Sequence, residues 1–400
     1  MWQIPPLVLY IIFFLDFFIA FFFLTIFIRT KFKSNEYKRK EFEITFVIPA
    51  FNCEKIIEKT IESIKKTKYN QDKIKIIIVN DGSTDNTLNV ANKLTKKYQG
   101  IKVFTKKNSG KADSLNFGLK KADTELVAVL DADTLLKEDL LEKTTSLFSE
   151  NTIAVTSRLK PMNNNKMIER LQEVEYTFSG FYRLMVGSLN SLPVAPAFTL
   201  FKREFFLKHG YFDRDNLTED LEMGLRVQSN HYNVGYVANS YAITEVPDNF
   251  KKLLKQRLRW GYGTLYNYNK YRKLFFNKNY GDLGLFVLPT AFLSIFVISL
   301  VFLFGIYTII AWIVEHLQML SIGWLFTFDF NINRTLIFIT ELRIVLVLFT
   351  IVLGLASFFL VNYELEEKLK IKYYFLYFTD YLWTLAIFYI LSLFYFIIKK

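Results

Sequence analysis

The 400-residue chain is 52% hydrophobic, and this content excludes one simple soluble domain. It contains 50 lysine and arginine residues against 38 aspartate and glutamate residues, which gives a net charge of +12. Part of the excess positive charge lies between Arg29 and Lys40, directly after an apolar run, as is typical of the cytoplasmic end of a membrane segment. We therefore expect these basic residues to contact membrane lipid and not nucleic acid. The single Cys53 excludes an intrachain disulfide, and the three histidines are too widely spaced for a histidine metal site.

Long apolar runs near both ends of the chain predict membrane segments, because about twenty predominantly apolar residues cross a bilayer. The N-terminal run, from Leu7 to Ile28, is longer than the core of a signal peptide and has its basic residues behind it, so residues 1–40 are expected to form a retained anchor with a basic juxtamembrane segment. Residues 276–400 are expected to form a C-terminal membrane region with about three spans, at residues 285–314, 335–361 and 373–398. The sequence thus predicts a multi-pass integral protein of the cell membrane.

Residues 41–275 have an ordinary globular composition and are predicted to form a cytoplasmic domain. Apolar, β-branched runs alternate with helical patterns there, which indicates an α/β fold with a doubly wound, mostly parallel sheet. Strands are expected at residues 44–48, 74–79, 101–104 and 126–130. Ligands of such sheets bind beyond the carboxyl ends of the strands, and two acidic turns follow the second and fourth of these strands.

The turn after the fourth strand contains Asp131 and Asp133, which are spaced so that both can face one cation. Mg²⁺ or Mn²⁺ takes a few carboxylates together with water and substrate phosphate oxygens, and such a metal neutralises a departing diphosphate. Taken alone, this pair and Asp81 are also ordinary turn residues, and Lys111 alone is typical of a solvated helix start. Their common place at one edge of one sheet favours a binding site.

Two later motifs each have a purely structural and a functional interpretation. Thr218-Glu219-Asp220 opens a predicted helix, where threonine and acidic residues also serve as plain caps. Gln256-Arg257-Leu258-Arg259-Trp260 follows a basic, amphipathic stretch and is also typical of an interfacial helix with Trp260 at the headgroup level. The lipid interpretation does not explain why glutamine, arginine and tryptophan occur together.

Five motifs in one order carry a family resemblance: Asn80-Asp81-Gly82-Ser83, Asn108-Ser109-Gly110-Lys111, Asp131-Ala132-Asp133, Thr218-Glu219-Asp220 and Gln256-x-x-Arg259-Trp260. Together they resemble the processive membrane synthases of glycosyltransferase family 2, which include the cellulose, poly-N-acetylglucosamine, hyaluronan and chitin-oligosaccharide synthases. The likeness covers about residues 44–275 and implies a GT-A-like catalytic domain.

The resemblance also implies a role for each matching residue. Asp220 matches the general base, while the donor-binding residues by resemblance are Asp81, Lys111, Asp131, Asp133, Pro49 and Asn52. Asp131 and Asp133 would hold the diphosphate through Mg²⁺ or Mn²⁺. The residues matched to the acceptor and diphosphate are Glu219, Gln256, Arg259 and Trp260. Pro196 departs from the small-residue lead-in of the family's acceptor segment.

The implied function is inverting transfer of a sugar, from a donor that we expect to be UDP-linked, to a growing β-linked polysaccharide, with export and an accessory subunit left open. One alternative is a single addition to a lipid-linked acceptor, against which the Gln-x-x-Arg-Trp motif argues. The other is an inactive scaffold subunit of an envelope-glycan assembly, against which the complete set of acidic motifs argues.

Overall fold

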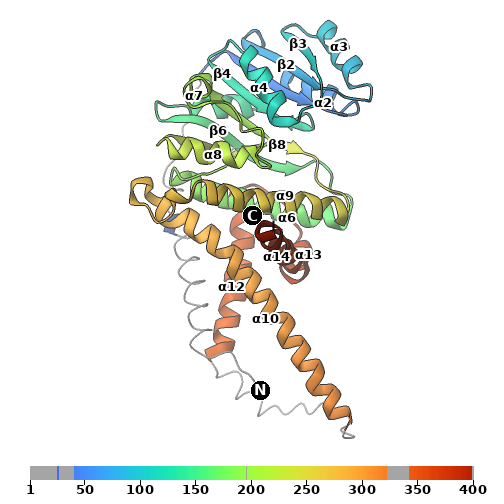
Figure 1. Ribbon diagram of the computed structural model, residues 1–400, viewed down its shortest axis with the longest axis vertical. Helices are drawn as coiled ribbons and strands as arrows, with labels where there is room; N and C mark the ends of the chain where they lie inside the picture. Colours follow the sequence, from blue (N-terminus) through green and yellow to red (C-terminus); the bar gives the residue numbers. More distant parts are fainter. Residues whose placement is uncertain (1–24, 27–39, 195, 322–341, 399–400) are drawn as a thin grey trace. The chain divides into compact units, whose positions relative to one another are not determined.

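The computed structural model describes residues 25–26, 40–194, 196–321 and 342–398 (Figure 1). One compact unit combines Asn35–Ser294 with Ile371–Lys400, and a second contains Ile295–Lys370. The first unit contains the sheet and every predicted site residue.

Eight strands form one mixed sheet in the order β3-β2-β1-β4-β7-β6-β8-β5. Their bounds are β1 Ile44–Ala50, β2 Ile74–Asp81, β3 Ile101–Lys106, β4 Leu126–Leu130, β5 Thr134–Leu136, β6 Thr152–Pro161, β7 Phe198–Lys202 and β8 Asn233–Thr244. Strands β3, β2, β1 and β4 are parallel, as predicted. The sheet as a whole is mixed rather than mostly parallel, because β7 runs antiparallel to both β4 and β6, and β5 runs antiparallel to β8.

Helices cover both faces of the sheet in Figure 1. Those of the globular part are α2 Ile57–Lys65, α3 Thr87–Lys97, α4 Lys111–Lys121, α5 Leu140–Ser146, α6 Met167–Ser188, α7 Arg203–His209, α8 Glu219–Ser229 and α9 Phe250–Lys270. Side chains of β1 alternate between two apolar cores: Phe46 and Ile48 lie in the core that contains α2, and Val47 lies in the core that contains α4. Gly118 lets α4 lie directly against Val47, because a Cβ there would overlap the valine.

The remaining helical segments follow α9 or lie between the strands. Short 3₁₀ turns occur at Gln71–Lys73, Arg272–Leu274 and Lys278–Tyr280, and π-helical turns at Leu283–Val287 and Tyr377–Tyr381. The other helices of this part are α10 Leu288–Ser321, α12 Leu342–Glu364, the short α13 Ile371–Leu376 and α14 Leu382–Ile398. Helix α14 packs along α9, and α13 packs against α6.

Within the described residues, two segments are long and apolar enough to cross a membrane, Leu283–Ala311 and Ile371–Ile398. They coincide with the first and third predicted C-terminal spans. Helix α12 occupies the described part of the second predicted span, whose beginning lies outside the described residues. The predicted N-terminal anchor also lies almost entirely outside them, so the count of three spans and the anchor stay predictions.

Candidate functional site

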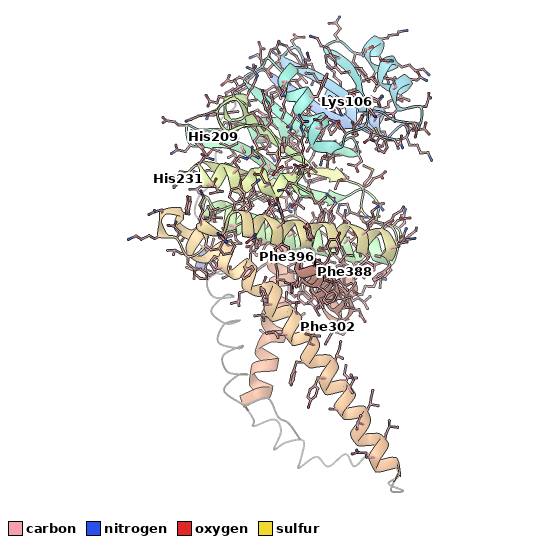
Figure 2. All side chains as sticks on the ribbon, viewed as in Figure 1. Lys106, His209, His231, Phe302, Phe388 and Phe396 are labelled. Atoms are coloured by element: carbon pink, nitrogen blue, oxygen red, sulfur yellow. The ribbon has the colours of Figure 1, made fainter. Side chains whose placement is uncertain are left out.

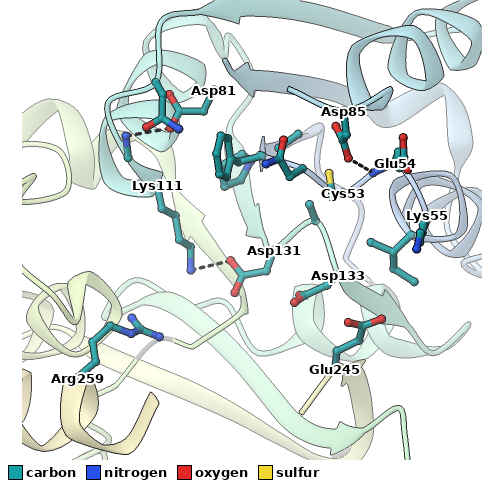
Figure 3. Close-up of a pocket in the computed structure, with 18 residues that line it drawn as sticks. Cys53, Glu54, Lys55, Asp81, Asp85, Lys111, Asp131, Asp133, Glu245 and Arg259 are labelled. Carbon is teal, nitrogen blue, oxygen red and sulfur yellow. Dashed lines mark hydrogen bonds and ion pairs between the residues drawn. The ribbon is translucent and has the colours of Figure 1, made fainter. Parts of the chain in front are cut away.

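A cavity of about 840 Å³ opens at the carboxyl ends of β1, β2 and β4 (Figure 3). Parallel strands bring these ends to the same edge, so turns that are far apart in sequence meet there. The predicted site residues in its wall are Pro49, Asn52, Asp81, Lys111, Asp131, Asp133 and Arg259. We call this space the larger cavity.

A smaller cavity of about 400 Å³ adjoins the larger one. The two cavities share part of their walls, formed by Lys111, Asp131, Asp133, Glu245 and Arg259. The predicted residues that line only the smaller cavity are Glu219, Asp220, Gln256 and Trp260. Every predicted site residue therefore lies on one of two connected spaces.

Asp81 ends β2 and is almost fully buried. One carboxylate oxygen accepts hydrogen bonds from the Ser109 amide at 3.0 Å and the Lys106 ammonium at 2.7 Å, and the other accepts from the Gly110 amide at 2.9 Å. Burial raises the pKa of Asp81, but Lys106 and the two amides outweigh it, and the pKa is lowered overall. Asp81 thus anchors the Gly110 turn, whose φ of +95° suits glycine, directly before Lys111.

Asn52 joins the turns after β1 and β2. Its backbone adopts a φ of +50°, which asparagine tolerates better than most residues. Its side-chain oxygen accepts a hydrogen bond from the Thr84 backbone amide at 2.9 Å, and the Asn52 backbone amide donates to Ser83 Oγ at 3.1 Å. Pro49, near the end of β1, pairs in register with Val79. Both predicted residues shape one wall of the larger cavity.

Lys111 connects three elements at the junction of the cavities. Its ammonium lies 2.7 Å from Asp131 Oδ1, a contact drawn in Figure 3, and 3.0 Å from Glu219 Oε1. Burial lowers the pKa of Lys111, but the charges of Asp131 and Glu219 outweigh it and hold the pKa above its ordinary value. The cation thereby joins the starts of α4 and α8 to the turn after β4.

Asp133 lies beside Asp131 and Glu245 on the shared wall, and Figure 3 shows the three carboxylates around one space. Burial, and then the charge of Asp131, raise the pKa of Asp133 to about 6. This crowding of negative charge fits a divalent cation. Within the described residues, no group of three or more His, Cys, Asp or Glu side chains has the arrangement of a metal site, so a cation here would also need substrate or water oxygens.

Glu245 is a site residue that the sequence analysis missed. It follows β8 directly and lines both cavities. The signal that could have found it is an acidic residue just after a strand, as for Asp131. Strand β8 was not among the predicted strands, so the position of Glu245 at the sheet edge could not be inferred.

Asp220 lies in the first turn of α8 and faces the smaller cavity. Its Oδ1 accepts a hydrogen bond from the Leu221 amide at 2.8 Å. Burial, and then the neighbouring charge of Glu219, raise the pKa of Asp220 to about 6 despite the attraction of Lys111. A carboxylate with a pKa near neutrality is suited to accept a proton at physiological pH.

Helix α9 turns one face toward the smaller cavity. Gln256, Trp260 and Thr264 are four residues apart and all line it, as helical periodicity requires. Arg259 lines both cavities, and its guanidinium donates to the Leu217 carbonyl at 3.0 Å, just before α8. The motif that predicted an acceptor site and the motif that predicted a base therefore face the same space.

A buried polar cluster connects α9 to the turn before Asp220. The Asn267 side chain donates to Asn216 Oδ1 at 3.1 Å and to Thr218 Oγ1 at 2.9 Å, and Asn216 donates back to Asn267 Oδ1 at 2.7 Å. Gly263 leaves room for Thr218, which a Cβ at that position would displace. These residues were also missed, because their pairing spans about fifty residues of sequence and depends on how α9 packs.

Pro196, the departure from the family pattern, also lines the smaller cavity. Its carbonyl accepts a hydrogen bond from Thr199 Oγ1 at 3.0 Å, and the next carbonyl, of Ala197, accepts from the Asp131 amide at 3.0 Å. The segment that contains the proline is thus fixed to the aspartate turn.

Comparison with known proteins finds a family match for the part of the chain that contains the first three motifs. Residues 45–210 match the family described as Glycosyl transferase family 2. This segment is a family 2 glycosyltransferase domain. The chain is 32% identical over 226 residues to the poly-beta-1,6-N-acetyl-D-glucosamine synthase of Staphylococcus aureus (strain COL), covering 55% of this chain and 54% of that one. It is 31% identical over 226 residues to the synthase of the same name from Staphylococcus epidermidis. The chain spans about half the length of these curated relatives.

Among solved structures, the mannosyltransferase PcManGT from Pyrobaculum calidifontis, in complex with GDP-Man and Mn²⁺, matches with a TM-score of 0.53 and 20% sequence identity. The match covers 66% of this chain and 74% of that one. At this identity the likeness shows the fold, which is a GT-A-like mixed α/β sheet. The predicted α/β class is thus confirmed, and the match over residues 45–210 agrees with the predicted family resemblance.

Proposed function

We propose that the family 2 domain makes this chain an inverting membrane glycosyltransferase, which moves a sugar from a UDP-linked donor onto a growing β-linked polysaccharide. The observation that carries the proposal is the shared wall of the two cavities. Asp131 and Asp133 lie on that wall, and Asp220 faces the smaller cavity beside it. A donor in one cavity and an acceptor in the other would therefore meet at these carboxylates.

The larger cavity is the proposed donor site. Its volume of about 840 Å³ is in the range of pockets that hold drug-sized ligands. Asp131 and Asp133 would hold Mg²⁺ or Mn²⁺ together with diphosphate oxygens. When bound, such a cation neutralises the charge that develops on the departing diphosphate. The Asn52 and Asp81 turns shape the nucleotide end of the site, and Lys111 supplies a positive charge at the diphosphate end.

Asp220 is the proposed general base in the smaller cavity. The acceptor hydroxyl oxygen attacks the anomeric carbon, its proton passes to the Asp220 carboxylate, and the bond between the anomeric carbon and the diphosphate oxygen breaks. One displacement inverts the configuration, so an α-linked donor gives a β-linked product. General base catalysis contributes about 10²–10⁴-fold to such reactions.

Trp260 and Arg259 are the proposed acceptor-side residues. The indole of Trp260 lines the smaller cavity and offers an apolar face on which the apolar face of a sugar ring can stack. The planar guanidinium of Arg259 reaches both cavities and suits phosphate oxygens. Together they would hold the acceptor end against the anomeric carbon.

The apolar helices support a membrane location. Leu283–Ala311 and Ile371–Ile398 are long enough to cross a bilayer. We propose the predicted arrangement, with residues 41–275 in the cytoplasm between an N-terminal anchor and a C-terminal membrane region, and with growth of the glycan at the membrane face. Coupling to export and an accessory subunit are compatible with this arrangement.

The test of this function uses the full chain in lipid nanodiscs with a panel of radiolabelled nucleotide sugars, followed by sizing of the products. Likeness to the Staphylococcus synthases leads us to expect N-acetylglucosamine transfer and a ladder of long chains. A product with one sugar that partitions into organic solvent would favour the lipid-linked alternative. If neither transfer nor donor hydrolysis is detected with any sugar, the result would favour the scaffold alternative.

A further inference from the structure

Glu175, on α6, lies where three elements of the catalytic unit meet. One of its carboxylate oxygens, Oε2, accepts a hydrogen bond from the Arg257 guanidinium at 2.6 Å and another from the Tyr381 hydroxyl at 2.8 Å. Arg257 belongs to α9, and Tyr381 ends the π-helical turn that leads into α14. Glu175 also lines the smaller cavity, although no motif marked it. Its carboxylate therefore connects the proposed acceptor space to the C-terminal helix.

Arg257 connects Glu175 to the motif residues on either side of it. Its guanidinium donates to the side-chain oxygen of Gln256 at 3.0 Å and lies 4.2 Å from the ring centre of Trp260. Arg257 is only 6% exposed, so its charge depends on its partners rather than on water. A buried arginine without its carboxylate is strongly unfavourable, and the side chain would have to move. Movement of Arg257 would release both Gln256 and Trp260.

The C-terminal helix is packed closely enough to hold Tyr381 in place. Gly261 of α9 lies directly against Ser392 of α14, since a Cβ at Gly261 would overlap the serine. Phe388 packs on Phe250 with ring centres 5.8 Å apart, and Figure 2 labels Phe388 on this helix. The helix is thus docked along the same α9 that carries the Gln-x-x-Arg-Trp motif.

We propose that Glu175 is the positioning residue of the acceptor side, and that Tyr381 holds the Glu175 carboxylate in place. The C-terminal helix thereby determines the positions of Gln256 and Trp260. This inference rests on the proposed function, because it assigns the smaller cavity to the acceptor. Glu175 does not touch the reacting atoms; it acts through Arg257. Docking of the apolar C-terminal helix is therefore part of the acceptor site and not only an anchor.

The test compares Glu175→Gln and Tyr381→Phe with the parent protein, as full chains in nanodiscs. Sugar transfer and donor hydrolysis to water are measured side by side, and transfer is followed at varied acceptor concentration. We expect the ratio of transfer to hydrolysis to fall about tenfold or more in Glu175→Gln and less in Tyr381→Phe, because the first leaves Arg257 without its charge partner. The fall should come mainly from a higher KM for the acceptor.

Two matched variants control for general damage. Glu173→Gln removes a carboxylate of the same helix that pairs with Arg170 at 3.2 Å and lies outside the smaller cavity. Tyr373→Phe removes a hydroxyl from α13 and keeps the ring that Arg170 and Lys372 overlie. Both controls should keep the parental ratio of transfer to hydrolysis.

The double variant Glu175→Gln with Tyr381→Phe separates coupling from two independent effects. If Tyr381 acts through Glu175, its loss should add no further defect once the carboxylate is gone. Independent effects that multiply would overturn the proposal, as would an unchanged ratio in Glu175→Gln. Transfer and hydrolysis that fall together would also overturn it, since Glu175 would then support the fold or the donor site.

A second readout does not depend on sugar transfer. In a chain whose only tryptophan is Trp260, the emission maximum and quenching by acrylamide report the surroundings of that indole. Both should change in Glu175→Gln and stay unchanged in Glu173→Gln. If no nucleotide sugar is a substrate, the proposed function fails while this measurement still decides on the positioning of Trp260: unchanged fluorescence in Glu175→Gln would overturn the inference.

Discussion

Burial and the charge of Glu219 raise the pKa of Asp220, which lines the smaller cavity, to about 6. The burial that raises the pKa of the proposed base also disfavours its ionised form. A group whose pKa is raised in the fold binds more protons there than in the unfolded chain, so its ionisation lowers stability as the pH rises through about 6. Function and stability therefore oppose each other at this residue.

Replacing Asp220 by asparagine tests both consequences. Transfer should fall about 10²–10⁴-fold, because the proton acceptor is lost while the shape of the side chain is kept. Binding of the nucleotide sugar, measured by calorimetry, should stay within a few-fold of the parent, and the Tm at pH 7.5 should rise. Transfer that persists at a tenth of the parental rate would remove Asp220 as the base.

The pH dependence of transfer follows from the same residue. The base must be ionised, so kcat should fall as the pH drops through about 6, well above the ordinary range of a carboxyl group. The measurement is kcat between pH 4.5 and 8 at saturating donor, acceptor and cation. A rate that stays constant down to pH 5 would show that no carboxyl group with a raised pKa acts in transfer.

Trp260 distinguishes stacking on the acceptor from anchoring in lipid. If its indole stacks on a sugar, Trp260→Ala should lose about 1–3 kcal/mol in transfer, on the scale of bases stacked on aromatic side chains, and Trp260→Phe should retain part of it. Donor hydrolysis should fall less than transfer in both. Equal losses would place Trp260 in support of the fold, and a shift in membrane association alone would leave it as an anchor.

At the scale of elements, α9 is the helix on which the site depends. One face carries Gln256 and Trp260 into the smaller cavity, Asn267 holds the turn before Asp220, and Gly261 lies against α14. The proposed base and the proposed acceptor motif are thus positioned by one helix, although they lie far apart in sequence.

Asn267→Ala tests this linkage. The change removes the acceptor of the buried Asn216 side-chain NH₂ and the donor to Thr218 Oγ1. An unpaired buried group costs about 1–3 kcal/mol, so the free energy of unfolding should fall. Transfer should fall more than donor binding, since the turn that carries Asp220 loosens. Asn269→Ala, on the exposed side of the same helix, is the control and should change neither. A loss of stability with transfer unchanged would separate the cluster from catalysis.

The elements that were predictable are those with a local signal. Residues 74–79 are β-branched except for Lys75 and lie in β2, and the acidic turn after β4 follows the apolar run at residues 126–130. Antiparallel β7 and the acid after β8 lack such a signal, so the mixed sheet and Glu245 could not be predicted. The contacts of Arg257 with Glu175 and Tyr381 depend on tertiary packing, which no spacing in the sequence encodes.

At the scale of the molecule, the chain forms two compact units. The sheet, α9 and the C-terminal helix belong to one unit, and Ile295–Lys370 belongs to the other. The segment Ile371–Ile398 is apolar enough for a membrane and yet belongs to the same unit as the sheet. The last of the predicted membrane spans therefore packs on the sheet domain within one unit.

The anomeric configuration of the product tests the central claim most directly. The full chain is incubated with an α-linked nucleotide diphosphate sugar and Mg²⁺ or Mn²⁺, and the new linkage is read by proton NMR, with a parallel reaction in excess chelator. A single displacement assisted by Asp220 and a cation held by Asp131 and Asp133 predicts a β-linked product and no turnover after chelation. An α-linked product, or full activity in excess chelator, would contradict the account.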